Sequence, residues 1–308
     1  MPEPPTLVRR GRLLRIGAAV AVLVGLVGYV VYVFGGKAAP RCQVVSGNGD
    51  GASYEFEVEQ AANAATVAAV GTSRGMPERA ITIALATALQ ESGLRNIGHG
   101  DRDSLGLFQQ RPSQGWGNEK QIMDPAYSAA RFYAHLNDVP GYSRLPLTVA
   151  AQRVQRSGYP QAYAKHEPDA ALLAAALTGR APATLTCEGR TADEPGDPAK
   201  LRAALARDFG RDVAPRGGRG RTLTVPVNAT AGSAEGGAGQ RGWELAHWAV
   251  AQASALGIER VTYGGSEWSA GDPGKEWRKP GKAGATGTDG QRSGGATGSD
   301  AVRIVMGQ

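Results

Sequence analysis

The sequence predicts an α+β fold with one N-terminal membrane helix, a mostly helical domain and a small α/β domain. Residues 16–36 form an uncharged apolar run, about as long as a helix that crosses the hydrocarbon core of a bilayer. Apolar residues then recur at helical spacing between residues 55 and 177. From residue 222 onward, short strand-like runs surround one amphipathic helical segment.

The N-terminal region has a marked charge asymmetry. Residues 1–15 contain four arginines, whereas Lys37 alone follows the apolar run directly. This asymmetry predicts a cytoplasmic tail at 1–15, a single membrane span at 16–36 and an extracytoplasmic remainder, with the cytoplasmic membrane as a partner. The alternative is a cleaved signal peptide ending near residues 37–39, although its apolar region would exceed the usual length of about 7–15 residues.

A mostly helical domain is predicted over residues 53–188, after a linker at 37–52. Helices are expected at 55–73, from Pro77 to residue 92, at 124–136, at 147–157 and at 160–177. Proline at position 77 and the Asp124-Pro125 pair are typical helix starts, and Ser92-Gly93 is a typical helix end. Residues 92–118 are rich in glycine, and we expect loops or a small hairpin there.

The last part of the chain is predicted to be a small α/β accessory domain at residues 222–308. A linker at 189–221 precedes it and holds one short helix at 198–209. Strands are expected at 223–227, 260–263 and 302–306, with a helix at 242–256. The Gly-rich stretch 271–300 is expected to be mobile. Four of the five tryptophans lie in this domain; Trp243 and Trp248 are expected to be buried rather than to stack on sugars.

Composition excludes several classes of ligand. The 34 Lys and Arg residues exceed the 28 Asp and Glu residues, giving a formal net charge of +6, which would attract anionic polymers. No motif combines aromatic and basic residues as nucleic-acid-binding modules do, so nucleic acid is not predicted as a partner. The four histidines lie far apart and no Cys-x-x-Cys occurs, so neither a metal nor another cofactor is expected.

The two cysteines, Cys42 and Cys187, bracket the helical domain. In an oxidising compartment they would form one disulfide that closes a very long loop, with a stabilisation of about 4–5 kcal/mol in the chain-entropy model. The alternative is a pair of unpaired thiols.

One carboxylic acid stands at the end of the helix that begins at Pro77. This is Glu91, and the Gly-containing stretch 104–110 returns about fifteen residues later. Cleavage of a glycosidic bond requires a proton donor beside the leaving oxygen, and burial raises the pKa of a carboxyl enough to keep its proton near neutral pH. The alternative is a helix-terminal glutamate in solvent.

The pair Glu91-Ser92, followed by Gly106-Leu107-Phe108-Gln109, resembles the signature of the lysozyme-like lytic transglycosylases of bacteria, over residues 53–178. The resemblance implies a peptidoglycan-cleaving enzyme at the cell surface, with Glu91 as acid and then base. It also implies attack by the 6-hydroxyl of N-acetylmuramic acid and a 1,6-anhydro product. The implied partners are peptidoglycan glycan strands and other cell-envelope proteins. The expected substrate-binding residues are Ser92, Gly106, Gln109, Trp116 and Tyr163.

The sequence departs from this family near residues 151–153, where a Tyr-Asn pair is expected and absent. Tyr163 is the candidate for the tyrosine that steadies Glu91. The missing pair favours an alternative, a non-catalytic peptidoglycan-binding or scaffolding protein on the same fold. A third interpretation is a hydrolytic muramidase, in which Asp101 or Asp103 would position water.

Overall fold

The chain folds as α+β, as predicted, with helices and two antiparallel sheets. The computed structural model describes residues 40–308 except 160, 190–194, 212, 216–219, 228–236, 273–275 and 280–299, and a few helical residues between 17 and 29. Residues 40–308 form one compact unit. Its first sheet comprises β1 (Arg41–Val45), β2 (Ser53–Glu57) and β3 (Leu185–Cys187). Its second comprises β4 (Thr222–Pro226), β5 (Ile258–Tyr263), β6 (Ser266–Ser269) and β7 (Ala301–Met306).

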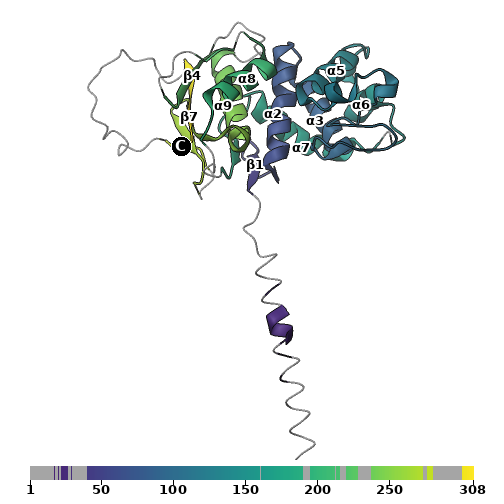
Figure 1. Ribbon diagram of the computed structural model, residues 1–308. Helices are drawn as coiled ribbons and strands as arrows, with labels where there is room; N and C mark the ends of the chain where they lie inside the picture. The colour runs from purple at the N-terminus through teal and green to yellow at the C-terminus, as the bar shows by residue number, and fades with distance from the viewer. Residues whose placement is uncertain are drawn as a thin grey trace, which may run out of the picture. The chain divides into compact units, whose positions relative to one another are not determined.

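The main helices are α2 (Val58–Ser73), α3 (Glu78–Ser92), α5 (Pro125–Asn137), α6 (Leu147–Gln155), α7 (Glu167–Leu177), α8 (Pro198–Phe209) and α9 (Gly237–Ala251). Shorter pieces are α4 (Glu119–Ile122), α10 (Ala253–Leu256) and the 3₁₀ turns η1 (Pro112–Gln114), η2 (Tyr142–Arg144) and η3 (Ala164–His166). Within the unit, α2 lies centrally, with α5 and α6 towards one end and β4 and β7 at the other (Figure 1).

The predicted membrane helix at residues 16–36 is wrong for the part of the chain that the structure describes. A helix must have about 20 consecutive apolar residues to span a bilayer. No helix among the described residues is both long and apolar enough to do so, and most positions of 16–36, like the whole tail 1–15, lie outside them. The single-pass membrane localisation predicted from this helix, with a cytoplasmic N-terminus and an extracytoplasmic remainder, is therefore wrong as well.

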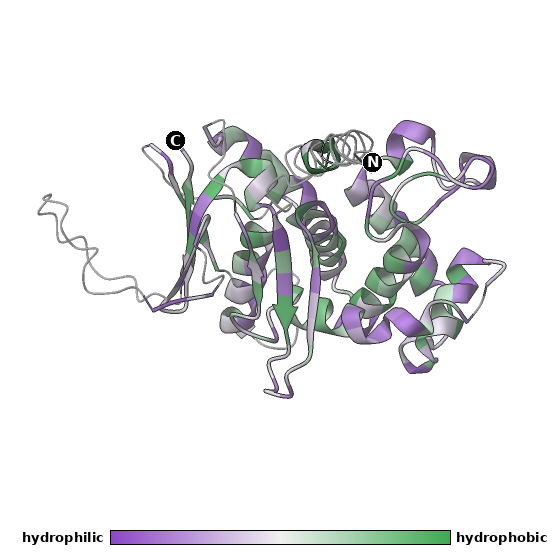
Figure 2. Cartoon of the chain, turned by 90° about the horizontal axis from the view of Figure 1, so that it is seen from below, coloured by the Kyte–Doolittle hydropathy of each residue, from purple (hydrophilic) through white to green (hydrophobic). Residues whose placement is uncertain are grey.

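Helix α2 organises the core because its residues are small and almost all of them are buried. Its sequence is rich in alanine, and α3, α5, α7, α8 and α9 all pack against it. Gly71, near its end, lies directly under the ring of Tyr133, where a Cβ atom would come within 2.7 Å of the hydroxyl oxygen. Figure 2 shows the hydrophobic residues gathered on the interior helices and the hydrophilic ones on loops at the periphery.

The predicted disulfide is present, and it lies within the first sheet. In the order β2-β1-β3, Cys42 of β1 pairs directly with Cys187 of β3, and their sulfur atoms are bonded at 2.04 Å. Strand β1 runs through the segment that the sequence predicted to be a linker. Its short alternation of buried and exposed residues gave too weak a signal by itself, since the strand is stabilised by pairing with β2 and with β3, the latter far along the chain.

Two of the predicted helices are divided in the structure. The expected helix at 160–177 is a 3₁₀ turn, η3, followed by α7, in which Pro168 lies in the first turn, where its missing N–H does no harm. The expected helix at 242–256 begins earlier, at Gly237, and is interrupted at Gln252 before α10. The Gly-rich stretch 271–300 and the basic linker near residue 216 lie largely outside the described residues.

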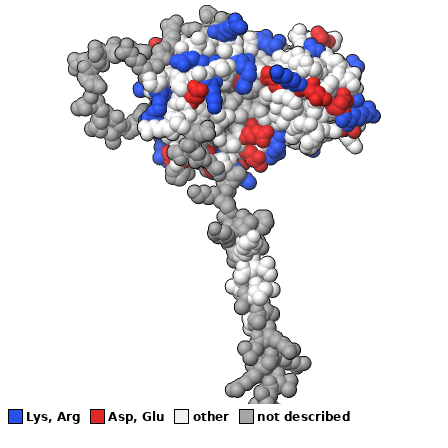
Figure 3. Space-filling view, viewed as in Figure 1, with Lys and Arg blue, Asp and Glu red and all other residues white. Residues whose placement is uncertain are grey.

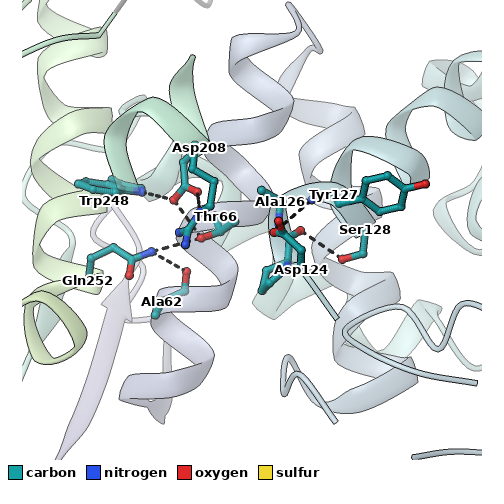
Figure 4. Close-up of polar contacts among 11 residues, drawn as sticks. Ala62, Thr66, Asp124, Ala126, Tyr127, Ser128, Asp208, Trp248 and Gln252 are labelled. Carbon is teal, nitrogen blue, oxygen red and sulfur yellow. Dashed lines mark hydrogen bonds and ion pairs between the residues drawn. The ribbon is translucent and has the colours of Figure 1, made fainter. Parts of the chain in front are cut away.

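The helical part and the C-terminal part of the unit share buried polar contacts. Asp208, at the end of α8, is fully buried and forms an ion pair with Arg207. Its carboxylate accepts hydrogen bonds from Thr66 of α2 at 3.0 Å and from the indole of Trp248 of α9 at 2.9 Å (Figure 4). Gln252 donates to the same threonine hydroxyl at 3.2 Å. A buried carboxylate is tolerated only with such partners. These contacts therefore fix the positions of α2, α8 and α9 relative to one another.

A second polar cluster joins α2 and α7 to α9. Glu244 and Arg241 form a buried ion pair at 2.7 Å, and the hydroxyl of Thr72 donates to Glu244. His247 contacts the carbonyl of Ala176 through Nδ1 at 2.7 Å. Burial lowers the pKa of His247 to about 4, so the ring is neutral at physiological pH.

The tryptophans of the C-terminal part are structural, as the sequence predicted for Trp248. Trp248 and Trp268 are fully buried, whereas Trp243 is half-buried and packs edge-on against Trp277 with ring centroids 5.1 Å apart. The indole of Trp268 donates to the carbonyl of Cys187, and that of Trp277 donates to Leu185. These bonds attach β3 of the first sheet to the second sheet's hairpin.

Helix α9 packs against Gly179, just after α7, so closely that no side chain fits at this position. A substitution of Gly179 is therefore expected to destabilise the fold. A Cβ atom at Gly179 would overlap the carbonyl oxygen of Gln240, and its φ of +75° also disfavours any side chain. We expect Gly179→Ala to lower the free energy of unfolding by about 3 kcal/mol, the sum of left-handed strain and overpacking.

Gly75 offers the matched control for this experiment. Its φ is +70° and no atom lies within 4 Å of the position that a Cβ atom would take, so Gly75→Ala should cost only the strain of about 1 kcal/mol. Urea denaturation of both variants measures the difference. Equal losses of stability in the two variants would contradict the close approach of Gly179 and α9.

Charged side chains are mixed on the surface of the unit. Figure 3 shows Lys and Arg interspersed with Asp and Glu on the face it presents. Ion pairs at the surface include Arg95 with Glu57 at 2.9 Å and Arg180 with Glu78 at 2.7 Å. Such pairs contribute little to stability, and on this face the excess positive charge is dispersed rather than gathered in one field.

Candidate active site

The end of α3 is fixed by backbone hydrogen bonds and by side chains of α2. Gly93 adopts φ +62°, and the N–H groups of Gly93 and Leu94 bond to the carbonyls of Leu89 and Ala88, which is a Schellman-type helix end. Gln60 donates to the carbonyl of Gly93 at 2.7 Å, and Asn63 donates to that of Leu94 at 2.8 Å. The last turn of α3, which carries Glu91, is therefore held rigidly.

Glu91 is half-buried and has a tyrosine as its hydrogen-bond donor. The hydroxyl of the buried Tyr163 donates to Oε1 of Glu91 at 2.6 Å. Desolvation raises the pKa of Glu91 above its ordinary value, while the hydrogen bond from Tyr163 and the polar amide of Gln155 oppose that rise. Glu91 therefore keeps its proton to higher pH than a solvated glutamate does. The hydroxyl of Tyr163 fixes the orientation of its carboxyl group.

Gln155, the last residue of α6, is a site residue that sequence reasoning missed. Its amide donates to the carbonyl of Phe108 at 2.7 Å and also faces Glu91. It occurs in the helix where the resembled family has its Tyr-Asn pair, about one turn beyond the expected position. Gln152, at that position, instead donates to the carbonyl of Ser157 at 2.8 Å. The sequence signal that could have identified Gln155 is an amide side chain at the end of an amphipathic helix.

Ser92 and Gly106 link the loop after α3 to the rest of the site. The hydroxyl of Ser92 donates to the carbonyl of Leu107 at 2.8 Å and so connects the two sequence motifs. Gly106 has φ +74°, and a Cβ atom there would lie 2.8 Å from the carbonyl oxygen of Ile122. Within the described residues, the need for glycine at this position arises from packing against Ile122.

Gln109 and Trp116 lie further along the same loop. Gln109 is half-buried, and its amide donates to the carbonyl of Gly106 at 3.2 Å. The half-buried Trp116 packs on His135 of α5 with ring centroids 4.3 Å apart, and its carbonyl accepts a bond from the hydroxyl of Tyr127. Within the described part of the chain, neither Gln109 nor Trp116 forms a hydrogen bond with Glu91.

The helix that follows this loop begins as the sequence predicted. Asp124 caps the start of α5 by accepting from the N–H of Ala126 at 2.9 Å (Figure 4). The first turn of α5 is thereby fixed beside the loop that carries Trp116.

The two aspartates of this loop differ from Glu91. Asp103 pairs with Arg111 at 2.6 Å and accepts from the N–H of Ser113 at 2.8 Å. Hydrogen bonds from Ser113 and Arg111 hold the pKa of Asp103 well below its usual range. Asp101 is exposed and lies 3.9 Å from Arg102. Asp103 is therefore an ionised, fully engaged group whose pKa is shifted in the direction opposite to that of Glu91.

The Tyr163–Glu91 hydrogen bond leads to a prediction for the pH profile of any activity that needs protonated Glu91. The bond stabilises the ionised form of Glu91 and lowers its pKa, so Tyr163→Phe should raise that pKa. Because the acid form is lost as pH rises through this pKa, we expect the alkaline limb of the profile to move upward. Rates measured between pH 4 and 9 test this, and an alkaline limb unchanged or moved downward would contradict it.

Comparison with known proteins bears on the C-terminal part only. A family model described as "VldE, C-terminal domain" matches residues 210–289. No curated protein matches the chain. The matched region contains α9, β5 and β6, and it lies outside residues 53–178, which carry Glu91 and its partners.

Proposed function

We propose that this protein cleaves the β-1,4 bond between N-acetylmuramic acid and N-acetylglucosamine in peptidoglycan glycan strands, as a lytic transglycosylase. The observation that carries the proposal is the desolvated carboxyl of Glu91, fixed at the end of α3 and held by the hydroxyl of Tyr163 at 2.6 Å. A carboxyl with a raised pKa in a rigid setting is suited to general acid catalysis.

The proposed reaction needs one carboxyl group and no water. Glu91 donates its proton to the glycosidic oxygen as the bond from that oxygen to C1 of the muramic acid breaks. The resulting carboxylate takes the proton of the 6-hydroxyl of the same sugar, whose oxygen forms the new bond to C1. The products are a 1,6-anhydro sugar and a free 4-hydroxyl, and Glu91 is protonated again.

Tyr163 and Gln155 serve both halves of this cycle. Tyr163 donates a hydrogen bond to Glu91, and the amide of Gln155 also lowers the pKa of Glu91, so both support the ionised form after the first proton transfer, while burial favours the protonated form before it. Their opposing effects keep the pKa between those of a solvated and a fully desolvated carboxyl, where a group can act as acid and then as base.

The state of Asp103 favours this reaction over hydrolysis. A muramidase needs a second carboxylate that is free to position water, and the inverting type separates its two carboxyls by about 6.5–9.5 Å. The oxygens of Asp103 are already engaged by Arg111 and Ser113, and Asp101 is exposed to solvent.

The test is digestion of purified, protein-free sacculi with the full-length chain, followed by mass analysis of the soluble muropeptides. We expect products that end in 1,6-anhydro-muramic acid. Products with reducing ends would identify a muramidase instead. Sedimentation of the protein with intact sacculi, without any release of muropeptides, would replace the proposal by a non-catalytic binding protein.

A further inference from the structure

Tyr159 is an exception to the burial of aromatic residues in the unit. Its relative exposure is 78 %, whereas every other Phe, Tyr or Trp side chain among the described residues 40–308 is buried or half-buried. Val45, at 40 %, is the next most exposed large apolar residue of that part. A single exposed aromatic residue is common on protein surfaces, so the position of Tyr159 decides whether it has a use.

The loop that carries Tyr159 is held at several points. Gln152 donates to the carbonyl of Ser157, and the hydroxyl of Ser157 accepts from the N–H of Tyr159 at 3.1 Å. The N–H of Ala162 bonds to the carbonyl of Tyr159 at 3.1 Å. The backbone of Tyr159 is thus fixed on both sides while its ring points into solvent.

The same loop also joins two partners of Glu91. Gln155 is the last residue of α6, just before the loop, and Tyr163, whose hydroxyl donates to Glu91, lies at the end of the loop. Tyr163 follows Tyr159 by four residues, so the reach of the chain and the length of a tyrosine side chain place the Cα atom of Tyr159 within about 25 Å of the Glu91 carboxylate. A short glycan strand spans that distance.

The chemistry of an exposed tyrosine suits a sugar. Its ring offers a large apolar face with few rotatable bonds, so little side-chain entropy is lost on contact, and its hydroxyl can hydrogen-bond at the edge. The C–H groups on one face of a hexose ring form a matching apolar surface. Trp248 and Trp268, which could offer the same contact, are fully buried.

We propose that Tyr159 is a substrate-binding residue that stacks on a sugar ring of a glycan strand bound at Glu91. This proposal rests on the proposed function for the identity of the ligand. It assigns Tyr159 to binding and not to bond cleavage, because Tyr163 and Gln155 already occupy the surroundings of the reacting carboxyl.

The experiment measures binding separately from cleavage. The full-length chain with Glu91→Gln is titrated with glycan strands freed of their peptides by an amidase, and Kd is measured by calorimetry. In this background we expect Tyr159→Ala and Tyr159→Leu to raise Kd about fivefold, the loss of one aromatic contact, and Tyr159→Phe to change it less than about twofold. Val45→Ala, the matched exposed control, should leave Kd unchanged.

The outcomes separate the two proposals. An unchanged Kd for Tyr159→Ala, or no measurable binding of the strands, would overturn the role of Tyr159 whatever the wild-type chain does to sacculi. A raised Kd in a chain that releases no muropeptides would support Tyr159 and refute cleavage. Because Tyr159 is exposed, its replacement should leave the midpoint of urea unfolding unchanged, and a Kd change in a destabilised variant would count against the proposal.

Discussion

Replacing Glu91 by glutamine is expected to lower the rate of muropeptide release from sacculi by about 10³-fold, the usual contribution of a general acid. Glutamine has nearly the same shape and can accept the hydrogen bond from Tyr163, but its amide protons are not acidic and cannot be transferred to the glycosidic oxygen. Release of 1,6-anhydro-muropeptides, followed by mass spectrometry over time, measures the effect.

The stability of this variant provides its internal check. Burial raises the pKa of Glu91 in the folded state, so the ionised side chain is less favourable there than in the unfolded chain. The contribution of Glu91 to stability is therefore fully present below its unfolded pKa and is lost as pH rises through its folded pKa. Glu91→Gln should equal the wild type in urea unfolding near pH 4 and be at least as stable at pH 7.

The matched control is Glu119→Gln in α4, where the glutamate is exposed in the first helical turn. This variant should cleave sacculi at the wild-type rate. A Glu91→Gln variant that retains more than a tenth of the wild-type rate would show that another group donates the proton, and the proposed mechanism would be abandoned.

Removal of the disulfide is expected to cause the largest loss of stability in the unit. Cys42 and Cys187 are separated by 145 positions in the sequence, and the chain-entropy model gives about 4–5 kcal/mol for closing a loop of that length. We expect the Cys42→Ala, Cys187→Ala double variant to lose an amount of this order in urea unfolding, measured with the oxidised wild type in the same buffer.

Reduction of the wild type serves as the control for packing effects. Both sulfurs lie in a buried strand pair, so the alanine variant loses some contacts as well as the crosslink. The reduced wild type should lie close to the double variant, and a reductant should leave the double variant unchanged. A difference of less than about 1 kcal/mol between oxidised and reduced wild type would refute the entropic account.

The helices of the first part could be predicted because their signals are local. Asp124-Pro125 caps α5 through a carboxylate that bonds to the N–H two residues on, and Ser92-Gly93 ends α3 because glycine accepts a positive φ. Apolar spacing along these segments predicted which faces are buried. Strands β1, β2, β3 and β6 escaped prediction because each is short, and the start of the helix expected at 55–73 is in fact the end of β2. Strands β1 and β3 also depend on pairing with each other, although they lie far apart in the chain.

The sequence by itself determined the α+β class, most helix boundaries, the pairing candidates Cys42 and Cys187, and Glu91 as a solitary acid at a helix end. Only the tertiary structure decided that Tyr163, 72 residues away, reaches that acid, and that Gln155 faces it where another residue pair was expected. It also decided that α9 packs against α2 and that no described helix can cross a membrane. The reason is physical: caps and periodicity depend on neighbours within one or two turns, whereas desolvation and side-chain contacts depend on which distant segments the core brings together.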